Sequence, residues 1–351
     1  MKHYFSVLLA GFFLFAGCNR QRTVNPLIQY EFSGGAGKYN YAPSAIQDKY
    51  GIRYVFVCQN KEPFVIRDYV YLFKGIPTKN GYVWQPGTEI VAPSASGWDK
   101  IHICDPDVRE FKTTYNGETY NWIMTYLGVD QWFNHNQIGL AVSKNIEGPY
   151  IKYDKNPLIA SQDTTSWGVG QSTSIVKDST TIQIYYTKHD PEAERKWFLC
   201  VREVKLDDLA HVVLGEEKVV PFLGPISYPA LSDKNLYMVS EIRVSQNNEI
   251  PTWVGNVCRL TYKPITESLF IEEDGWIDIG RVTPEETGFP RNHNPGILTD
   301  TKGYMLNTDE LVVYFTVAMT GDNWLWSYDL YSATFDIRSF EKKKKNKEVS
   351  I

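Results

Sequence analysis

The chain of 351 residues has no long stretch in which apolar residues recur at the i, i+3, i+4 spacing of an amphipathic helix, which excludes a helical bundle. It also lacks an apolar run long enough for a transmembrane helix, since residues 5–16 fall short of the roughly 20 residues that a span requires. Positive charge is in deficit, with a formal net charge of -5. A general nucleic-acid binder needs a basic face to displace counterions from phosphate, so we expect no nucleic-acid partner.

Aromatic residues are abundant, with 23 Tyr, 17 Phe and 10 Trp. Together with β-branched residues they gather in short runs, which favours strands over helices. The length allows one large all-β domain or two ordinary domains. Composition alone therefore predicts an all-β protein and leaves the number of domains open.

The N-terminus carries the most specific short signal. Met1-Lys2-His3 precedes the apolar run of residues 5–16, and Ala16-Gly17-Cys18 follows it. This pattern resembles a bacterial lipoprotein signal with its lipobox, although Phe15 stands where Leu is commoner. The resemblance implies cleavage before Cys18, lipidation of Cys18 with palmitate, and a cell-envelope protein that meets the membrane through its lipid anchor only. The alternative is a simple secretory signal with a chance cysteine.

The expected domain boundaries start from this signal. We expect residues 1–17 to be the signal peptide, 18–27 a linker, 28–338 the folded domain, and 339–351 a disordered basic tail. Four cysteines remain in the folded part: Cys58, Cys104, Cys200 and Cys258. They allow two disulfides in an oxidising compartment. Because Cys58 and Cys200 lie in apolar, strand-like runs, four buried free thiols are at least as well supported.

A weak internal repeat appears where turns give way to hydrophobic runs. Its five segments are YAPSAIQD from Tyr41, CDPDVREF from Cys104, QSTSIVKD from Gln171, SYPALSDK from Ser227 and HNPGILTD from His293. The third positions are spaced by 63, 67, 56 and 66 residues, and an aromatic-rich strand follows each segment. Short strands repeated at such a period predict a five-bladed β-propeller with four-stranded blades around a central pocket.

In a propeller the first strand of each blade lines the axis, so the starts of these strands should converge at the mouth of the channel. We therefore expect a ring of polar residues there, contributed by all five blades. Its members are Tyr41-Ala42, Cys104-Asp105, Gln171-Ser172, Ser227-Tyr228 and His293-Asn294.

The second blade, with CDPDVREF and then NQIGLAVSKNIEGPY from Asn136, resembles the five-bladed propeller glycosidases of glycoside hydrolase family 43 and its relatives. The resemblance implies a two-carboxylate mechanism, with a base Asp in the first blade, an orienting Asp in the second and an acid Glu in the third. Asp105 matches the second of these. Ala42 stands in the first position and Gln171-Ser172 in the third, so the usual set of acids is incomplete.

His293 matches a fifth-blade His that, in several propellers of this clan, binds a central metal. With Asp105 and Gln171 it forms a set of oxygen and nitrogen ligands suited to one divalent ion, calcium, manganese or zinc. Such an ion could replace a missing acid by lowering the pKa of a bound water.

The remaining candidates are weaker. Glu241 is the best remaining acid, or else pairs with Arg243 or another cation, and Asp107 could share a strand face with Asp105. We expect substrate contacts from Gln171, Tyr41, Tyr228, Arg291 and Trp167. Arg291, like Arg67-Asp68, could bind a charged sugar substituent, and among Trp98, Trp132, Trp167 and Trp253 one or two should stack on sugar rings. Each residue also has an ordinary structural explanation: a turn cap, a surface ion pair, a buried histidine or a packed tryptophan.

These observations predict an exported hydrolase of glycosidase type, acting on a poly- or oligosaccharide with or without a metal. Two alternatives stay open. One is a metal-dependent amino-sugar deacetylase on the same fold. The other is a glycan-binding lipoprotein without catalysis, which the missing acids at Ala42 and Gln171 favour.

Overall fold

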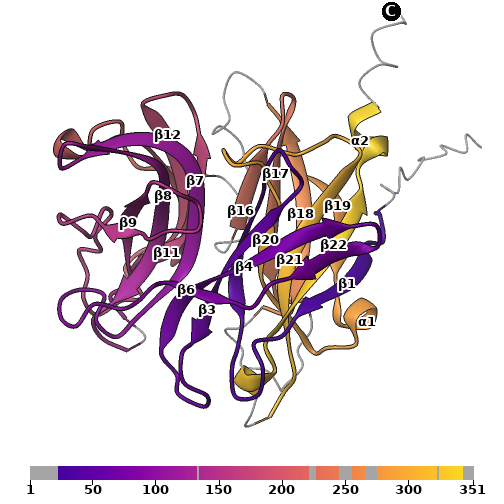
Figure 1. Ribbon diagram of the computed structural model, residues 1–351. Coiled ribbons are helices and arrows are strands. Elements are labelled where there is room, and N and C mark those ends of the chain that lie inside the picture. Colours follow the sequence, from indigo (N-terminus) through magenta and orange to yellow (C-terminus); the bar gives the residue numbers. More distant parts are fainter. Residues whose placement is uncertain are drawn as a thin grey trace, which may run out of the picture.

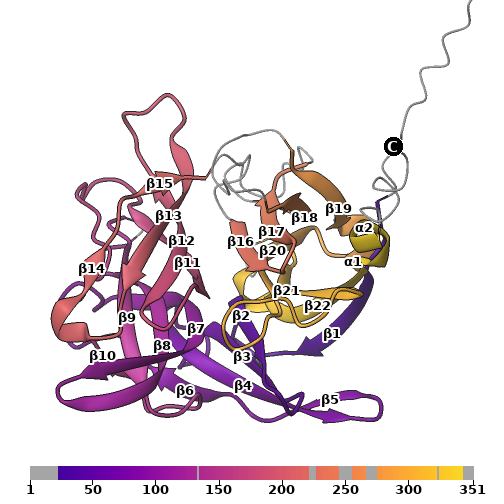
Figure 2. The same cartoon turned by 90° about the horizontal axis from the view of Figure 1, so that it is seen from above.

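Five antiparallel sheets, arranged around a common axis, make up the protein (Figures 1 and 2). The computed structural model describes residues 23–132, 134–220, 227–244, 255–265, 275–321 and 324–342. Strands dominate this part of the chain, and its helices are short. The all-β, five-bladed β-propeller that the repeat predicts is confirmed.

Each blade places its first strand at the axis and stacks the others outward. The first blade contains β2 (Tyr41–Gln47), β3 (Arg53–Asn60), β4 (Asp68–Thr78) and β5 (Gly81–Trp84), with β6 (Thr88–Val91) also paired to β4. The second contains β7 (His102–Tyr115), β8 (Glu118–Val129), β9 (Gln137–Ser143) and β10 (Ile151–Lys152). The third contains β11 (Val169–Val176), β12 (Thr181–His189), β13 (Trp197–Lys205) and β14 (Val213–Leu214), with β15 (Lys218–Val219) paired to β13.

The last two blades follow the same plan. The fourth contains β16 (Ser227–Leu231), β17 (Asn235–Ile242), β18 (Val257–Pro264) and β19 (Ile277–Val282). The fifth contains β20 (Arg291–Ile297), β21 (Glu310–Ala318), β22 (Asp329–Asp336) and β1 (Leu27–Phe32). The helical segments are η1 (Leu209–His211), α1 (Pro284–Thr287), η2 (Trp324–Ser327) and α2 (Arg338–Lys342).

The outer strand of the fifth blade comes from the opposite end of the described chain. β1 pairs antiparallel with β22, in a register that sets Leu27 opposite Thr334 and Tyr30 opposite Tyr331. The repeat in the sequence did not predict this ring closure. Pairing satisfies the edge of β22, which would otherwise leave a row of open hydrogen-bonding groups.

The folded part extends beyond residues 28–338 at both ends. The amide of Val24 donates to the carbonyl of Ile279, at 2.8 Å. At the other end Phe340, in α2, is 9% exposed and packs against the core of the fourth and fifth blades. The signal peptide, Cys18 and most of the basic tail lie outside the described residues, so those predictions stay predictions. Within the described residues, no helix is long and apolar enough to cross a bilayer.

The hydrophobic cores lie between neighbouring blades. One core joins β8 and β9 of the second blade to β11, β12 and β13 of the third, and every residue of β9 is buried because both faces of its sheet are covered. The core of the fourth and fifth blades is built in the same way. This packing holds the first strands of the blades close together at the axis.

Four of the five innermost strands share a local distortion at the repeat. Ala42, Asp105, Gln171 and Asn294 all have left-handed backbone, with φ of 51°, 45°, 52° and 43°, and the pairing register shifts around each of them. Such β-bulges re-aim side chains and are common beside active sites. In the third blade the bulge residue is Gln171 itself. The structural repeat is thus offset by one residue from the sequence alignment, which set Gln171-Ser172 opposite Cys104-Asp105.

The four cysteines adopt neither arrangement considered from the sequence. Cys58 of β3 and Cys104 of β7 form a disulfide with an S–S distance of 2.04 Å, and Cys200 and Cys258 are buried free thiols. Because the disulfide joins two adjacent blades, its pairing depends on blade-to-blade contacts that strand periodicity does not reveal.

Candidate functional site

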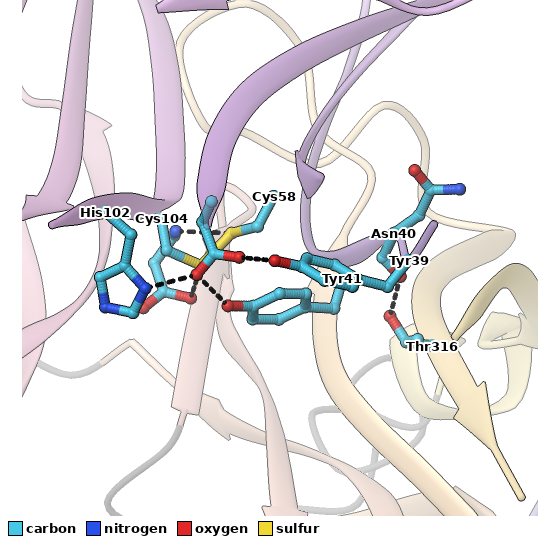
Figure 3. Close-up of a disulfide and its surroundings, with 9 residues drawn as sticks. Tyr39, Asn40, Tyr41, Cys58, His102, Cys104 and Thr316 are labelled. Atoms are coloured by element: carbon cyan, nitrogen blue, oxygen red, sulfur yellow. Dashed lines mark hydrogen bonds and ion pairs between the residues drawn. A yellow bond between two sulfur atoms is a disulfide. The ribbon is translucent and has the colours of Figure 1, made fainter. Parts of the chain in front are cut away.

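Two carboxylate–histidine pairs lie near the mouth of the central channel, one from the first two blades and one from the last two. The first pair is Asp68 at the start of β4 with His102 at the start of β7, and Nδ1 of His102 lies 2.8 Å from Oδ2 of Asp68. Two tyrosines reach the same carboxylate: the hydroxyl of Tyr39 donates to Oδ1 at 2.5 Å and that of Tyr41 to Oδ2 at 2.7 Å (Figure 3).

These contacts keep both members of the first pair charged. Burial alone would raise the pKa of Asp68, but the contacts with His102 and the two tyrosine hydroxyls outweigh it, so the pKa is lowered. Burial would lower the pKa of His102, yet the Asp68 carboxylate raises it overall. Both groups are therefore charged at least between the ordinary pKa values of 3.8 and 6.5. The pair also corrects the expectation for Arg67-Asp68, because Asp68 is buried and Arg67 donates to the carbonyls of Lys100 and Ile101.

Asp105 lies beside this pair and differs from it in having no strong donor. Its carboxyl is buried, and no N–H or O–H group of the described residues donates to it. Burial raises its pKa to about 7, the negative Asp68 adds to the shift, and His102 opposes it. Near neutral pH Asp105 is thus partly protonated, which is the state in which a carboxylic acid can give up a proton.

The second pair joins the fourth and fifth blades. Nδ1 of His293 in β20 lies 2.6 Å from Oε2 of Glu241 in β17. Glu241 also accepts from the backbone amides of Asn294 and Gly255, both at 2.9 Å. A terminal nitrogen of Arg291 lies 2.9 Å from the same Nδ1. Since Nδ1 carries one hydrogen at most, its donation to the carboxylate leaves Arg291 to act through its charge.

The protonation states of the second pair follow from these contacts. Burial would raise the pKa of Glu241, but His293, Arg291 and the amide of Asn294 lower it to about 2. Burial and the Arg291 charge lower the pKa of His293, although Glu241 opposes them. At neutral pH the pair is an ionised carboxylate and a neutral imidazole whose Nε2 makes no hydrogen bond within the described residues. A carboxyl with this pKa cannot donate a proton at neutral pH, which corrects the acid role expected for Glu241; its partner is His293, with Arg291 as a nearby cation.

Tyr41 connects the two pairs. Its hydroxyl donates to Asp68, and its ring lies parallel to that of His293, with centroids 6.4 Å apart and an interplanar angle of 19°. Tyr228 is also influenced by groups on both sides of the mouth. Burial raises the pKa of its phenol most, and the charges of Asp105 and Glu241 raise it further. Its buried hydroxyl has no hydrogen-bond partner in the part of the chain that the structure describes. Both tyrosines therefore lie where the sequence placed them, at the mouth.

Arg291 occupies a different setting from the one expected. It is 4% exposed, its guanidinium donates to the hydroxyl of Tyr328, and it lies over the rings of Trp324 and Tyr328. Such a buried guanidinium supports the Glu241–His293 pair. It is not placed to bind a charged substituent in the open mouth.

Below the mouth the channel narrows to a cavity of about 20 Å³, lined by all five innermost strands. That volume accommodates about one water molecule. Asp105 and Tyr228 lie in its wall, together with Ala42 and Pro43. A sugar ring does not fit inside this cavity.

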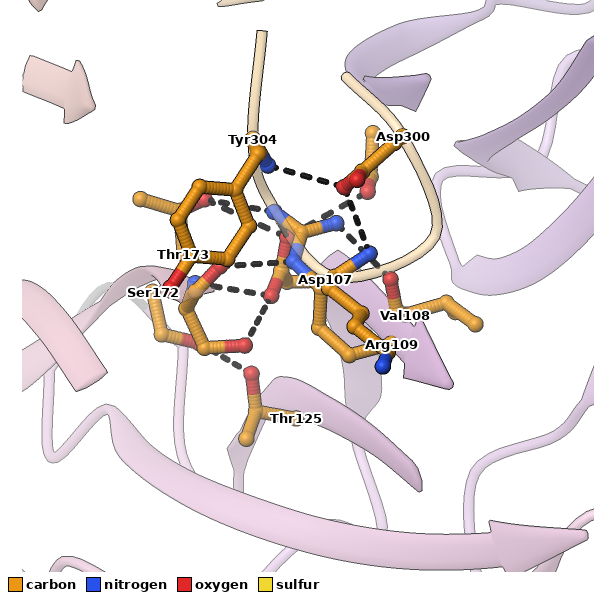
Figure 4. A network of polar contacts seen from close by, with 11 residues as sticks. Asp107, Val108, Arg109, Thr125, Ser172, Thr173, Asp300 and Tyr304 are labelled. Carbon is orange, nitrogen blue, oxygen red and sulfur yellow. Dashed lines mark hydrogen bonds and ion pairs between the residues drawn. The ribbon is translucent and has the colours of Figure 1, made fainter. Parts of the chain in front are cut away.

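Asp107 also lines the cavity, but its carboxylate is bound to groups that link the second blade to the third. Its Oδ1 pairs with Arg109 at 2.7 Å, and its Oδ2 accepts from the amide and hydroxyl of Ser174 (Figure 4). Arg109 in turn donates to the carbonyl of Ser174 at 2.6 Å. With every acceptor occupied, Asp107 ties the second blade to the third, and this geometry does not support the catalytic role expected for it.

Aromatic residues lead outward from the mouth over the third blade. Trp167 packs in the apolar cluster around Ala42 and meets Trp197 edge to face, with centroids 5.3 Å apart. Trp197 is 37% exposed and contacts His189 in a tilted arrangement, with ring centroids 4.4 Å apart. His189 lines a groove of about 670 Å³. Of the other tryptophans, Trp98 packs on Tyr126, Trp132 is half exposed beside His102, and Trp253 lies outside the described residues.

The three residues expected to hold a metal are Asp105, Gln171 and His293. Among the described residues, one set of three His, Cys, Asp or Glu ligand atoms lies within 4.8 Å of one another, and it comprises Cys58, Cys104 and Asp105. The disulfide removes its two thiolates. His293 uses Nδ1 for Glu241, which leaves its Nε2, while Gln171 has a buried Oε1 without a hydrogen-bond partner among the described residues, an atom that a ligand could satisfy. The metal at Asp105, Gln171 and His293 stays a prediction.

Sequence reasoning missed the roles of Asp68, His102 and Tyr39. The signal that could have found them is position, because Asp68 and His102 begin strands at the same end of the sheet as the repeat segments. Their pairing, 34 residues apart in the chain, depends on how the first blade packs on the second.

Comparison with known proteins agrees with this architecture. No family model and no curated protein match the sequence. Among solved structures, a thermostable family-43 glycoside hydrolase is 14% identical, with a TM-score of 0.56 over 86% of this chain and 91% of that one. A family 117 glycoside hydrolase from the marine bacterium Zobellia galactanivorans is 11% identical, with a TM-score of 0.54 over 89% and 90%. An endo-arabinase from Bacteroides thetaiotaomicron is 12% identical, with a TM-score of 0.54 over 90% and 98%. At these identities the similarity shows a shared fold.

Proposed function

We propose that the protein is a carbohydrate-active hydrolase of the glycosidase type, which cleaves an oligo- or polysaccharide bound at the mouth of the propeller. The proposal rests on two groups at the mouth, one of which carries a proton near neutral pH while the other is free to accept one. Asp105 is partly protonated near neutral pH, whereas His293 is neutral and oriented by Glu241. Titratable groups whose surroundings push their pKa values apart are the usual signature of an acid and a base in one site.

In this reaction Asp105 gives its proton to the glycosidic oxygen as the bond to the anomeric carbon breaks. Nε2 of His293 takes a proton from the water whose oxygen attacks that carbon. Glu241 holds the imidazole in the tautomer with the hydrogen on Nδ1 and stabilises the imidazolium that forms. The imidazolium then releases its proton to solvent, and Asp105 takes up a proton from solvent, which restores the starting state. The scheme uses one carboxyl and one histidine, which accounts for Ala42 and Gln171 where the family 43-like pattern has acids.

An extended substrate suits the surface better than a small one. The axial cavity is too small for a sugar, whereas Trp167, Trp197 and His189 contact one another in series and His189 lines the groove on the third blade. Aromatic faces of this kind bind the apolar faces of sugar rings. The activities of two structural neighbours, a glycoside hydrolase and an endo-arabinase, support a carbohydrate substrate.

The test is a screen of purified protein against a panel of plant, algal and bacterial glycans, with reducing ends and oligosaccharide products as the readout. We expect turnover of at least one glycan by the wild type and its loss in D105N and H293A. A glycan that the wild type and both variants cleave equally would refute the site. Saturable binding without product, measured by calorimetry on the same panel, would instead establish the non-catalytic alternative.

A metal-dependent amino-sugar deacetylase is the second candidate. The orphaned Oε1 of Gln171 favours it, because a metal or a metal-bound water would satisfy that atom. Nε2 of His293 and the carboxylate of Asp105 would complete the set, for calcium, manganese or zinc, and the ion would polarise the substituent's carbonyl. Acetate release without chain cleavage, together with about one metal per chain by elemental analysis, would select this candidate over the first.

We further propose that the protein is exported and anchored by lipid at Cys18, on the envelope side of a membrane. The buried disulfide supports this placement, since disulfides persist in oxidising compartments. The test is metabolic labelling with palmitate followed by fractionation. The wild type should be labelled and sediment with membranes, and C18A should be unlabelled. A labelled C18A protein would disprove the anchor.

A further inference from the structure

The disulfide lies directly against the proposed acid. Cys58 belongs to the second strand of the first blade and Cys104 to the innermost strand of the second, and both are buried. Cys104 immediately precedes Asp105, and the amide of Asp105 donates to Sγ of Cys58 at 3.0 Å (Figure 3). The disulfide is therefore connected to the backbone of Asp105 in two ways: Cys104 is its neighbour in the chain, and Cys58 accepts the hydrogen bond from its amide.

The sheet itself does not hold Asp105. Pairing between β7 and β8 stops at Cys104 opposite Leu127 and resumes at Asp107 opposite Thr125. Asp105 and Pro106 form the bulge between them, Asp105 has φ of 45°, and Pro106 has no amide hydrogen. Left-handed backbone is costly for a residue other than Gly and persists where the surroundings enforce it. The sulfur of Cys58 is the acceptor that the ladder fails to provide.

We propose that the Cys58–Cys104 disulfide is the positioning element of Asp105, so that the oxidised protein is the active form and a thiol or phosphine reductant switches it off. The inference rests on the proposed function for the role of Asp105 and adds a redox requirement to it. Reduction breaks the S–S bond, the two sulfurs take up two electrons and two protons, and the phosphine or dithiol reductant is oxidised. The bulge then loses its link to the first blade.

The experiment uses the full chain in three forms: wild type, C58A/C104A and C200A. C200A is the matched control because Cys200 is equally buried but unpaired. Each is assayed before and after a phosphine reductant, in the presence of EDTA, because the two thiolates and Asp105 lie close enough to bind zinc once reduced. Mass-tagging of thiols confirms reduction, and thermal melting confirms that the protein is folded at the assay temperature.

We expect reduction to lower kcat of the wild type and C200A by about 10²-fold with KM unchanged, the effect of displacing a catalytic group by about 1 Å. Reoxidation with oxidised glutathione should restore both, and C58A/C104A should be slow and insensitive to reductant. Hydrogen exchange at the amide of Asp105 should accelerate with reduction, while amides in β8 and β9 stay protected. Wild type that is fully reduced, folded and unchanged in kcat and exchange would overturn the proposal.

A second variant separates positioning from loss of the cross-link. C58S/C104A lacks the disulfide but offers a hydroxyl oxygen to the amide of Asp105, so its kcat should exceed that of C58A/C104A at equal stability. Equal kcat in the two variants would refute the hydrogen bond's role. Hydrogen exchange needs no substrate, so a redox-sensitive Asp105 in a protein that cleaves no glycan would refute the proposed function and leave the positioning intact.

Discussion

Nδ1 of His293 lies 2.6 Å from Oε2 of Glu241, and the two residues are 52 positions apart, in different blades. The carboxylate is ionised because its pKa is about 2, so it holds the imidazole hydrogen on Nδ1 and leaves Nε2 as the basic atom. The histidine singled out by the HNPGILTD repeat thus has a partner that fixes its tautomer. The Glu241–His293 pair can therefore be tested by mutation independently of the Asp68–His102 pair.

Replacing Glu241 with Gln should remove the orienting charge and keep the shape. We expect kcat to fall by about 10²- to 10⁴-fold, the contribution typical of a positioned general base. Steady-state kinetics on the substrate found by the glycan screen provides the measurement. E118Q is the control, because Glu118 forms an exposed pair with Lys144. An E241Q protein that is folded and as fast as E118Q would contradict the role of Glu241.

Replacing Asp105 with Asn should make stability less dependent on pH. The folded protein keeps the Asp105 proton up to pH about 7, whereas the unfolded chain releases it near 3.8. As pH rises between these values, the wild type should lose up to ~1.4 kcal/mol of unfolding free energy per pH unit from this group. Asn does not titrate and tolerates left-handed backbone. Urea unfolding at pH 5 and pH 8 should show D105N gaining relative to wild type at the higher pH, and parallel behaviour would refute the raised pKa.

The pH dependence of kcat/KM should be bell-shaped. Rates should fall as pH rises through about 7, because Asp105 loses its proton, and His102 sets part of that limit through its own charge. They should fall on the acid side below 6.5, because the pKa of His293 is lowered from that value and the protonated ring is no base. E241Q should move the acid limb to lower pH, since Glu241 raises the pKa of His293. An acid limb that stays in place would argue against His293 as the base.

Replacing Arg109 with Met should destabilise the protein without touching the chemistry. It would leave the buried Asp107 carboxylate without its cation, a loss of about 3 to 5 kcal/mol for a broken buried pair. Chemical denaturation is the measurement, and R338M, which breaks the exposed pair with Asp336, is the control. We expect the folded R109M protein to keep its kcat. A selective loss of kcat with unchanged stability would restore Asp107 as a catalytic candidate.

Replacing Trp197 with Ala should weaken the binding of long oligosaccharides. Loss of one aromatic contact of about 1 kcal/mol corresponds to roughly a fivefold rise in KM. The shortest cleaved substrate serves as the control, because it should not reach the groove beyond Trp197. KM values across a series of chain lengths provide the measurement. A uniform change at all lengths would show that Trp197 acts through packing with Trp167 and not through a distant sugar.

The fold could be predicted because its signal is local. The turn and the aromatic strand lie close together in the sequence of each blade, and four blades add a bulge at the same place. The repeat of Tyr41, Cys104, Gln171, Ser227 and His293 therefore marked all five innermost strands. The same property explains the error in the third blade. In that blade the bulge begins at Gln171. The sequence alignment set Thr173 opposite the Pro residues of the other blades, although in the structure Thr173 lies one residue beyond the equivalent position.

The site was predictable only in part, because its contacts cross between blades. Asp105, His293, Tyr41 and Tyr228 were found from their positions at strand starts. Their partners were not, since no local pattern links Glu241 to His293. The disulfide and the Asp68–His102 pair are hidden for the same reason, and burial then sets the pKa values that distinguish an acid from an orienting carboxylate.

The pairing of β1 with β22 has a consequence for how the chain reaches its native state. Residues 27–30 find their partners about 300 positions later, so the last ladder to form is also the longest-range contact in the protein. Closing so large a loop is slow, and folding rates fall as such distant contacts come to dominate. Until β22 has been synthesised, the first strand has no place to dock. The ring therefore forms late, and the two histidine pairs, one from the first two blades and the other from the last two, come together on either side of Tyr41 only with it.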